Sequence, residues 1–154
     1  MRTRTGSRVF VQNRIGRKGV PATSSFERWV RTALRGRHQS RRQVNIALFG
    51  ESEGRELNRR YCGKDYATNV LSFAYEPLPR ERSLLLGDLA ICASVVVREA
   101  AEQGKPLRHH YAHLTVHGVL HLLGFDHESA ADAAQMEDME RRILACLNIP
   151  DPYA

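Results

Sequence analysis

The chain has 154 residues, of which 42% are hydrophobic and 26% are charged, and these proportions are typical of one soluble globular domain. No apolar run approaches the roughly 18 residues of a membrane span, and the first 20 residues lack the apolar stretch of a signal peptide. We therefore expect no membrane partner. The three cysteines are scattered, with no C-x-x-C pair, so we expect no disulfide framework and a cytoplasmic location.

The net charge of +6 is unevenly distributed along the chain. Residues 1–42 contain twelve lysines and arginines but a single acid, whereas the remainder contains eleven basic and sixteen acidic residues. A positive N-terminal third predicts a polyanionic partner, most simply nucleic acid, with Arg41 and Arg42 as candidate contacts. Two alternatives stay open. The charge is merely solubilising, or residues 1–19 are a mitochondrial transit peptide, against which an apparent short strand at residues 9–11 argues.

Hydrophobic spacing and turn residues predict alternating strands and helices. The expected elements, in chain order, are a strand over 9–13, a helix from about Pro21 through Leu34, a strand over 44–49, a helix over 52–61 ended by Gly63, strands over 68–75 and 84–92, and helices over 94–103, 107–123 and 129–147. This alternation predicts one layered α/β domain over residues 1–154 with about four strands, in which residues 1–20 form a basic arm and the first strand.

The segment His117-Gly-Val-Leu-His121-Leu-Leu-Gly124-Phe-Asp-His127 is the most informative part of the chain. On a helix, His117 and His121 project from one face, about 40° apart around the axis and about 6 Å along it. Gly124 can end the helix in a left-handed turn, which brings His127 back toward the pair. Three histidines leave one position of a tetrahedral zinc open, as in catalytic zinc sites.

These histidines have other interpretations. A lone histidine pair at this spacing is more often solvated or packed in a core, but the glycine and the third histidine favour a bound divalent metal. Zinc suits neutral imidazoles best, although nickel, copper or iron would also bind. Zinc proteases of the H-E-x-x-H type carry a glutamate base after the first histidine, and Gly118 occupies that position here. Peptide hydrolysis by that route is therefore not expected, and Asp126 is left as either a base or a group that orients a ligand.

Several segments form a recognisable set together with the histidine motif: Glu56-Leu-Asn58, Tyr61, Gly63-Lys-Asp65, Thr68-Asn-Val-Leu-Ser-Phe73, Leu86-Gly-Asp88 with Ile91-Cys92, and His117 to His127 itself. Together they resemble the YbeY family of bacterial metal-dependent endoribonucleases, also described as rRNA maturation factors. The resemblance extends roughly from Val44 to the C-terminal Asp151-Pro-Tyr153.

This resemblance implies a small α/β fold in which a mixed sheet and about five helices surround one Zn²⁺ held by His117, His121 and His127. It implies cleavage of single-stranded RNA, including precursor 16S rRNA near its 3′ end, in the maturation, assembly and quality control of the small ribosomal subunit. A ribosomal protein and an Era-type GTPase are the partners that the resemblance implies.

One position departs from the family. Most members have Tyr-Arg-Gly-Lys where this chain has Tyr61-Cys62-Gly63-Lys64. The resemblance implies that the family's arginine faces the active-site cleft, where a neutral cysteine cannot bind a phosphate in the bidentate fashion of a guanidinium. Either Arg59, Arg60 or Lys64 supplies the charge, or cleavage is weak and the protein is a non-catalytic assembly factor with a zinc site. Cys62 as a fourth zinc ligand is a further alternative.

The leading hypothesis is metal-assisted cleavage of a phosphodiester, with the attacking group left open between water and the RNA 2′-hydroxyl. The catalytic candidates are Asp126, Arg60 and Lys64, and the candidate RNA contacts are Arg59, Arg41, Arg42 and His113. For His113, one helical turn before His117, the alternatives are a metal ligand, an RNA contact, a partner of a ligand or a solvent-facing side chain.

Overall fold

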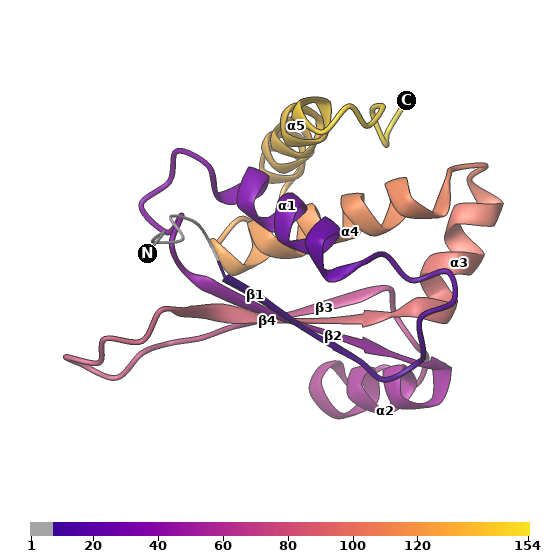
Figure 1. Ribbon diagram of the computed structural model, residues 1–154, viewed down its shortest axis with the longest axis horizontal. Helices are drawn as coiled ribbons and strands as arrows, with labels where there is room; N and C mark the ends of the chain where they lie inside the picture. Colours follow the sequence, from indigo (N-terminus) through magenta and orange to yellow (C-terminus); the bar gives the residue numbers. More distant parts are fainter. Residues whose placement is uncertain (1–7) are drawn as a thin grey trace.

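A mixed four-stranded sheet lies at the centre of the structure, a computed structural model that describes residues 8–154 (Figure 1). The elements are β1 (Arg8–Asn13), α1 (Thr23–Leu34), β2 (Gln43–Phe49), α2 (Glu51–Cys62), β3 (Val70–Ala74), β4 (Leu85–Cys92), α3 (Ala93–Glu102), α4 (Leu107–Leu122) and α5 (Ala130–Cys146). The predicted α/β domain with about four strands and five helices is confirmed. The first seven residues of the expected basic arm lie outside the described residues.

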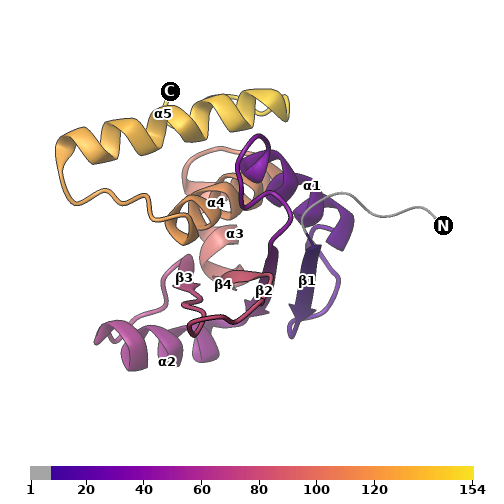
Figure 2. The same cartoon turned by 90° about the vertical axis from the view of Figure 1, so that its left-hand side faces the viewer.

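The strand order is β1-β2-β4-β3, in which β1, β2 and β4 are parallel and β3 is antiparallel to β4. β3 is therefore an edge strand of the described sheet. The two faces of the sheet differ. Helices α1 and α4 pack on one face with α5 beyond α4, whereas α2 lies against the other face (Figures 1 and 2).

Strand alternation explains this layering. Val44, Ile46 and Leu48 alternate with less buried residues along β2, and their side chains are buried in the core beneath the helices. Trp29 and Phe26 of α1 are buried in the same core, with their rings 5.2 Å apart at a T-shaped angle. The helices on this face and the sheet thus enclose one contiguous hydrophobic core.

Helix α4 is buried along most of its length because the sheet, α1, α3 and α5 all contact it. Its close approach to the sheet depends on two glycines. A Cβ at Gly118 would lie 2.8 Å from Leu89 Cδ2, and a Cβ at Gly87 would lie 2.6 Å from Leu122 Cδ2. These contacts fix the rotation of α4, and with it the direction in which the histidines point. Among the described helices, none is both long and apolar enough to cross a membrane.

Candidate metal centre

The three histidines of the sequence motif converge at the end of α4. His117 and His121 lie on the last two turns of the helix, and the backbone then turns at Gly124, which has a φ of +97°. His127 follows in the loop that leads to α5. One ring nitrogen from each histidine lies within 4.8 Å of the others, and the Nε2 atoms of His117 and His121 are 3.1 Å apart. The predicted convergence of the three imidazoles is confirmed.

This arrangement fits a metal ion. Zinc–nitrogen bonds of about 2.0–2.1 Å in a tetrahedral site place the donor nitrogens about 3.3 Å apart, which is close to the 3.1 Å between His117 and His121. Among residues 8–154, the triad is the only group of three or more histidine, cysteine or carboxylate side chains close enough to share an ion. Cys62, exposed at the end of α2, is not part of the group, so the structure gives no support to a fourth thiolate ligand.

The triad opens to solvent on one side. The side chain of His117 is 24% exposed, whereas that of His127 is 58% exposed. Burial lowers the pKa of His121, and the neighbouring His117 and His127 lower it further. A lowered pKa favours the neutral imidazole, which is the form that binds a metal. The site therefore offers three imidazole donors with one accessible side.

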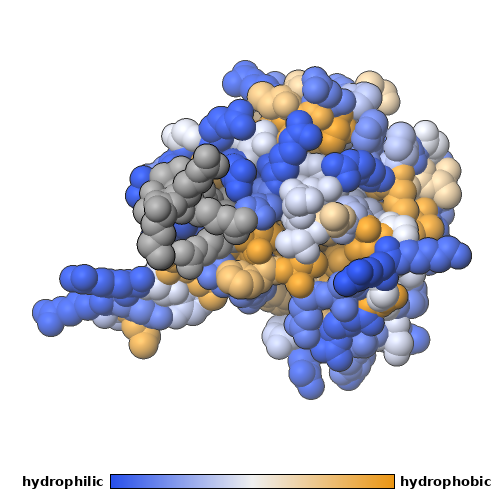
Figure 3. All heavy atoms as spheres, viewed as in Figure 1, coloured by the Kyte–Doolittle hydropathy of each residue, from blue (hydrophilic) through white to orange (hydrophobic). Residues whose placement is uncertain are grey.

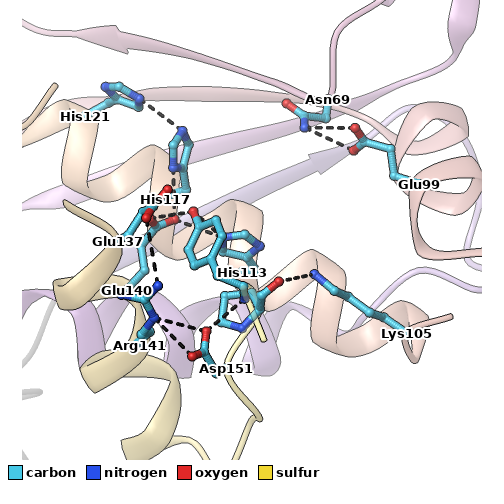
Figure 4. A network of polar contacts seen from close by, with 12 residues as sticks. Asn69, Glu99, Lys105, His113, His117, His121, Glu137, Glu140, Arg141 and Asp151 are labelled. Carbon is cyan, nitrogen blue, oxygen red and sulfur yellow. Dashed lines mark hydrogen bonds and ion pairs between the residues drawn. The ribbon is translucent and has the colours of Figure 1, made fainter. Parts of the chain in front are cut away.

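A buried carboxylate orients the first ligand. Glu140 of α5 is fully buried, and its Oε1 accepts hydrogen bonds of 2.9 Å from His117 Nδ1 and from His113 Nε2 (Figure 4). Because Nδ1 of His117 is bound to Glu140, its Nε2 is left for the ion. Carboxylate–histidine–metal chains of this kind fix the tautomer and the ring orientation of a ligand.

Electrostatics keep Glu140 ionised. Burial alone would raise the pKa of its carboxyl, but the hydrogen bonds from His113 and His117 outweigh burial and lower the pKa to about 2. Sequence reasoning missed this residue. Its signal is the spacing of Met136, Glu140 and Leu144, which places an acid in line with the buried side chains of α5.

The C-terminal segment closes this polar network. Tyr153 donates its hydroxyl hydrogen to Glu140 Oε2 at 2.9 Å, and its ring packs on edge against His113 with centroids 5.3 Å apart. Arg141 stacks over Tyr153 at 5.3 Å and is ion-paired with Asp151 (Figure 4). The Asp151-Pro-Tyr153 segment thereby supports the far side of Glu140.

The structure places the predicted site residues of α4 and its turn in distinct environments. His113 is only 9% exposed and is bound to Glu140, so it supports a ligand indirectly through that carboxylate. Asp126 is exposed, and its Oδ1 accepts a 2.7 Å hydrogen bond from the backbone N–H of His127. The Asp126 carboxylate lies 4.0 Å from His127 Nδ1, so it holds the loop and does not bond the imidazole.

Gly118 faces the sheet and not the triad. A Cβ at this position would meet Leu89 and Ser72, so a glutamate side chain would be pressed into β3 and β4. The position that carries the base in H-E-x-x-H proteases therefore has no room for a side chain without a shift of its neighbours. This geometry adds a structural argument against peptide hydrolysis to the missing side chain.

The basic candidates lie in two parts of the chain. Arg59, Arg60 and Lys64 lie on or just after α2, on the face opposite α4, and Arg59 is ion-paired with Glu56 at 2.7 Å (Figure 2). The structure does not bring these three residues together with the triad. Just before β2, Arg41 is exposed and Arg42 is half-buried.

One basic residue of the N-terminal third contacts the metal-site loop, and sequence reasoning missed it. The guanidinium of Arg37 stacks over the ring of Phe125 at 5.3 Å, two residues before His127. The segment between α1 and β2 therefore borders the turn that positions the third histidine.

These features define a class: a small α/β protein whose most buried helix and the turn after it bring together three histidines that could hold a metal ion. Comparisons with known proteins agree with it. The family model described as Endoribonuclease YbeY matches residues 11–148. Proteins named Endoribonuclease YbeY from Stenotrophomonas maltophilia (strain K279a) and Xanthomonas axonopodis pv. citri (strain 306) are 57% and 55% identical over 150 residues, which is 95% of this chain and 92% of each relative.

A solved structure shares the fold. The solution structure of TM1509 from Thermotoga maritima aligns with a TM-score of 0.54 at 25% identity, over 92% of this chain and 91% of that one. The chain belongs to the YbeY endoribonuclease family.

Proposed function

We propose that this protein is a zinc-dependent endoribonuclease that cuts single-stranded RNA. The observation that carries the proposal is the open triad of His117, His121 and His127, which provides three imidazole donors and leaves one side accessible. Bound zinc would supply Lewis-acid chemistry by polarising the phosphate and making water a better nucleophile near neutral pH. Membership of an endoribonuclease family supports RNA as the substrate.

The protein's own residues have separable roles in this proposal. Glu140 and His113 hold His117 in one orientation, and the turn at Gly124 sets the position of His127. Asp126, exposed beside His127, is the proposed proton acceptor. Arg60 and Lys64 are proposed to neutralise phosphate charge from the side of α2. Contacts of Arg59, Arg41 and Arg42 with the RNA backbone would be independent of sequence and sensitive to salt.

The biological setting is part of the same proposal. We propose that the cytoplasmic substrate is precursor 16S rRNA near its 3′ end, and that cleavage serves the maturation and quality control of the small ribosomal subunit. A ribosomal protein and an Era-type GTPase are the proposed partners. The whole chain, including the basic residues 1–20, would act as one RNA-binding and catalytic unit.

The direct test compares His121→Ala with His38→Ala, which removes a histidine outside the triad. Both proteins are checked for folding by circular dichroism and assayed on a fluorescent single-stranded RNA and on its duplex. The proposal expects His121→Ala to lose cleavage and His38→Ala to retain it, with the duplex resistant. Equal cleavage by the two variants would overturn metal catalysis.

The alternative of a non-catalytic assembly factor rests on Cys62, where the family has arginine. Membership of an endoribonuclease family and the open metal centre do not favour this alternative. Cys62→Arg provides the test, with Cys146→Arg as a matched exposed control. A gain in cleavage for Cys62→Arg alone indicates an attenuated enzyme. No detectable cleavage by either the original protein or Cys62→Arg, with RNA binding retained, supports the assembly factor.

A further inference from the structure

The sheet face opposite the metal centre contains a hollow that the proposed chemistry does not use. Its volume is ≈ 620 Å³, and it lies beside α2 on the surface of β1, β2, β4 and β3. The small side chains of Ala47 and Ala90 leave room at its centre, while Leu57 of α2 contributes to its wall. Figure 3 shows apolar side chains gathered above the hydrophilic α2 on the face seen there.

Aromatic rings line this hollow, and two of them are unusually exposed. Phe10 is 55% exposed and Tyr61 is 58% exposed, and Tyr61 meets Phe73 edge to face with centroids 5.1 Å apart. Large apolar side chains gathered on a surface mark a binding site more often than isolated ones do. Flat rings on an open sheet are a surface on which unpaired bases stack.

The floor of the hollow carries hydrogen-bonding groups between the rings. Asn45 donates through Nδ2 to Asp88 Oδ1 at 2.9 Å, and Gln43 donates through Nε2 to Asn45 Oδ1 at 2.9 Å. Asp88 is exposed, and its other carboxylate oxygen has no hydrogen-bond partner among residues 8–154. A fixed carboxylate between aromatic rings can accept a hydrogen bond from the edge of a stacked base.

Positive charge lies close in sequence to Tyr61, which lines the hollow. Arg55 and Arg59 of α2 are ion-paired with Asp65 and Glu56, respectively. Arg60 and Lys64, which flank Tyr61 along the chain, belong to no ion pair within the described part of the chain. These two cations complement the phosphates of a nucleic acid whose bases enter the hollow.

The hollow and the metal centre meet across one strand. Phe73 lines the hollow, whereas its neighbour Ser72 donates its hydroxyl hydrogen to the Gly118 carbonyl at 3.3 Å, beside His117 on the other face. Successive side chains of a strand point to opposite faces, and β3 is an edge strand of the described sheet. A single RNA strand that crosses the sheet edge at β3 can therefore contact both the hollow and the histidine triad.

We infer that this hollow binds unpaired bases of the same RNA strand that is cut at the triad. The stacking residues are Phe10, Tyr61 and Phe73, Asp88 accepts hydrogen bonds from base edges, and Arg60 and Lys64 contact the adjoining phosphates. The inference rests on the proposed ribonuclease function and adds to it a separate site for substrate binding.

The test measures RNA affinity without cleavage. In the His121→Ala background, Phe10→Ala and Tyr61→Ala are compared with Val97→Ala, which truncates an exposed apolar residue of α3. The probe is a fluorescent ten-nucleotide single-stranded RNA, paired with an abasic strand of the same length. Each aromatic substitution is expected to weaken binding of the normal strand about tenfold and to leave binding of the abasic strand unchanged.

Several outcomes would overturn the inference. The inference fails if Phe10→Ala and Tyr61→Ala bind the normal strand as tightly as Val97→Ala does. It also fails if the aromatic substitutions weaken binding of the normal and abasic strands equally. If Phe10→Ala instead shifts sedimentation from dimer to monomer with unchanged RNA affinity, the hollow binds a second copy of the chain. Failure of the broader proposal is distinguishable, because the original protein would then not cut the normal strand, whether or not the aromatic substitutions change its RNA affinity.

Discussion

At the scale of single residues, the metal centre depends on side chains that do not touch the ion. Glu140 comes from a different helix, lies 23 residues from His117 in sequence and is fully buried. A buried carboxylate without partners is strongly destabilising, whereas one bound to two imidazoles and a phenol is stably ionised. The sequence motif supplied the ligands, but their orientation comes from α5 and the C-terminal segment.

Glu140→Gln tests this orientation. The amide keeps the shape of the side chain but not its charge, so the tautomer of His117 is no longer enforced. We expect zinc affinity to fall about 10–100-fold, measured by competition with a chromophoric chelator. Asp138→Asn, at an exposed position of the same helix, provides the control and should leave zinc affinity unchanged. Equal zinc affinities in the two variants would contradict the positioning role of Glu140.

Gly118 supports a second prediction at this scale. Gly118→Ala places a methyl group 2.8 Å from Leu89 Cδ2, so either the Leu89 side chain or the α4 backbone has to shift. Overpacking of this kind costs about 1–3 kcal/mol of unfolding free energy, which urea denaturation measures. Gly118→Glu should destabilise the fold more and should gain no peptidase activity on a casein substrate. A stable Gly118→Glu protein that cleaves casein would refute the packing described for α4.

At the scale of elements, the end of α4 determines whether the third histidine reaches the other two. Periodicity and glycine placement were sufficient to predict the α4 helix, its end and the return of His127. The same signals also predicted the other helices and strands. For example, buried and less buried side chains alternate along β2, and α2 ends at Gly63. They did not predict that α2 lies on the opposite face from α4, because long-range packing decides which face a helix covers.

Gly124→Ala tests the turn itself. The φ angle is +97°, and no heavy atom lies within 4 Å of the position that an alanine Cβ would take, so any destabilisation comes from backbone conformation and not from crowding. We expect a cost of about 1–2 kcal/mol in unfolding free energy and weaker zinc binding through His127. Gly124→Asn should restore part of the stability and of the zinc affinity, since asparagine tolerates positive φ better than alanine. Wild-type zinc affinity in Gly124→Ala would contradict this role of the turn.

At the scale of the whole molecule, charge is segregated in a way that suits a polyanion. The basic N-terminal third runs through the segment in which Arg37 meets Phe125, and the acidic excess lies elsewhere. The uneven charge along the sequence predicted a nucleic-acid partner but left a solubilising surface and a transit peptide as alternatives. It did not reveal the hollow on the second face of the sheet, because Phe10, Asn45, Phe73 and Asp88 meet only through strand pairing.

Salt dependence is the prediction at this scale. The logarithm of the RNA affinity of His121→Ala should fall linearly with the logarithm of salt concentration. The reason is that the protein's lysine and arginine side chains release counterions from the phosphates that they bind. The double variant Arg41→Ala/Arg42→Ala should bind more weakly at low salt and show a slope smaller by about 0.7 for each phosphate that it no longer neutralises. Arg98→Ala, at an exposed position of α3, is the control. An unchanged slope in the double variant would remove Arg41 and Arg42 from the RNA-binding surface.

The claim that RNA cleavage depends on one ion held by His117, His121 and His127 is tested most directly by metal titration. Protein stripped with a chelator is titrated with Zn²⁺ while cleavage of a single-stranded RNA is followed. We predict no cleavage without metal, recovery in proportion to added zinc and saturation at about one equivalent per chain. Full cleavage by the stripped protein, or the same recovery in His121→Ala, would contradict the account.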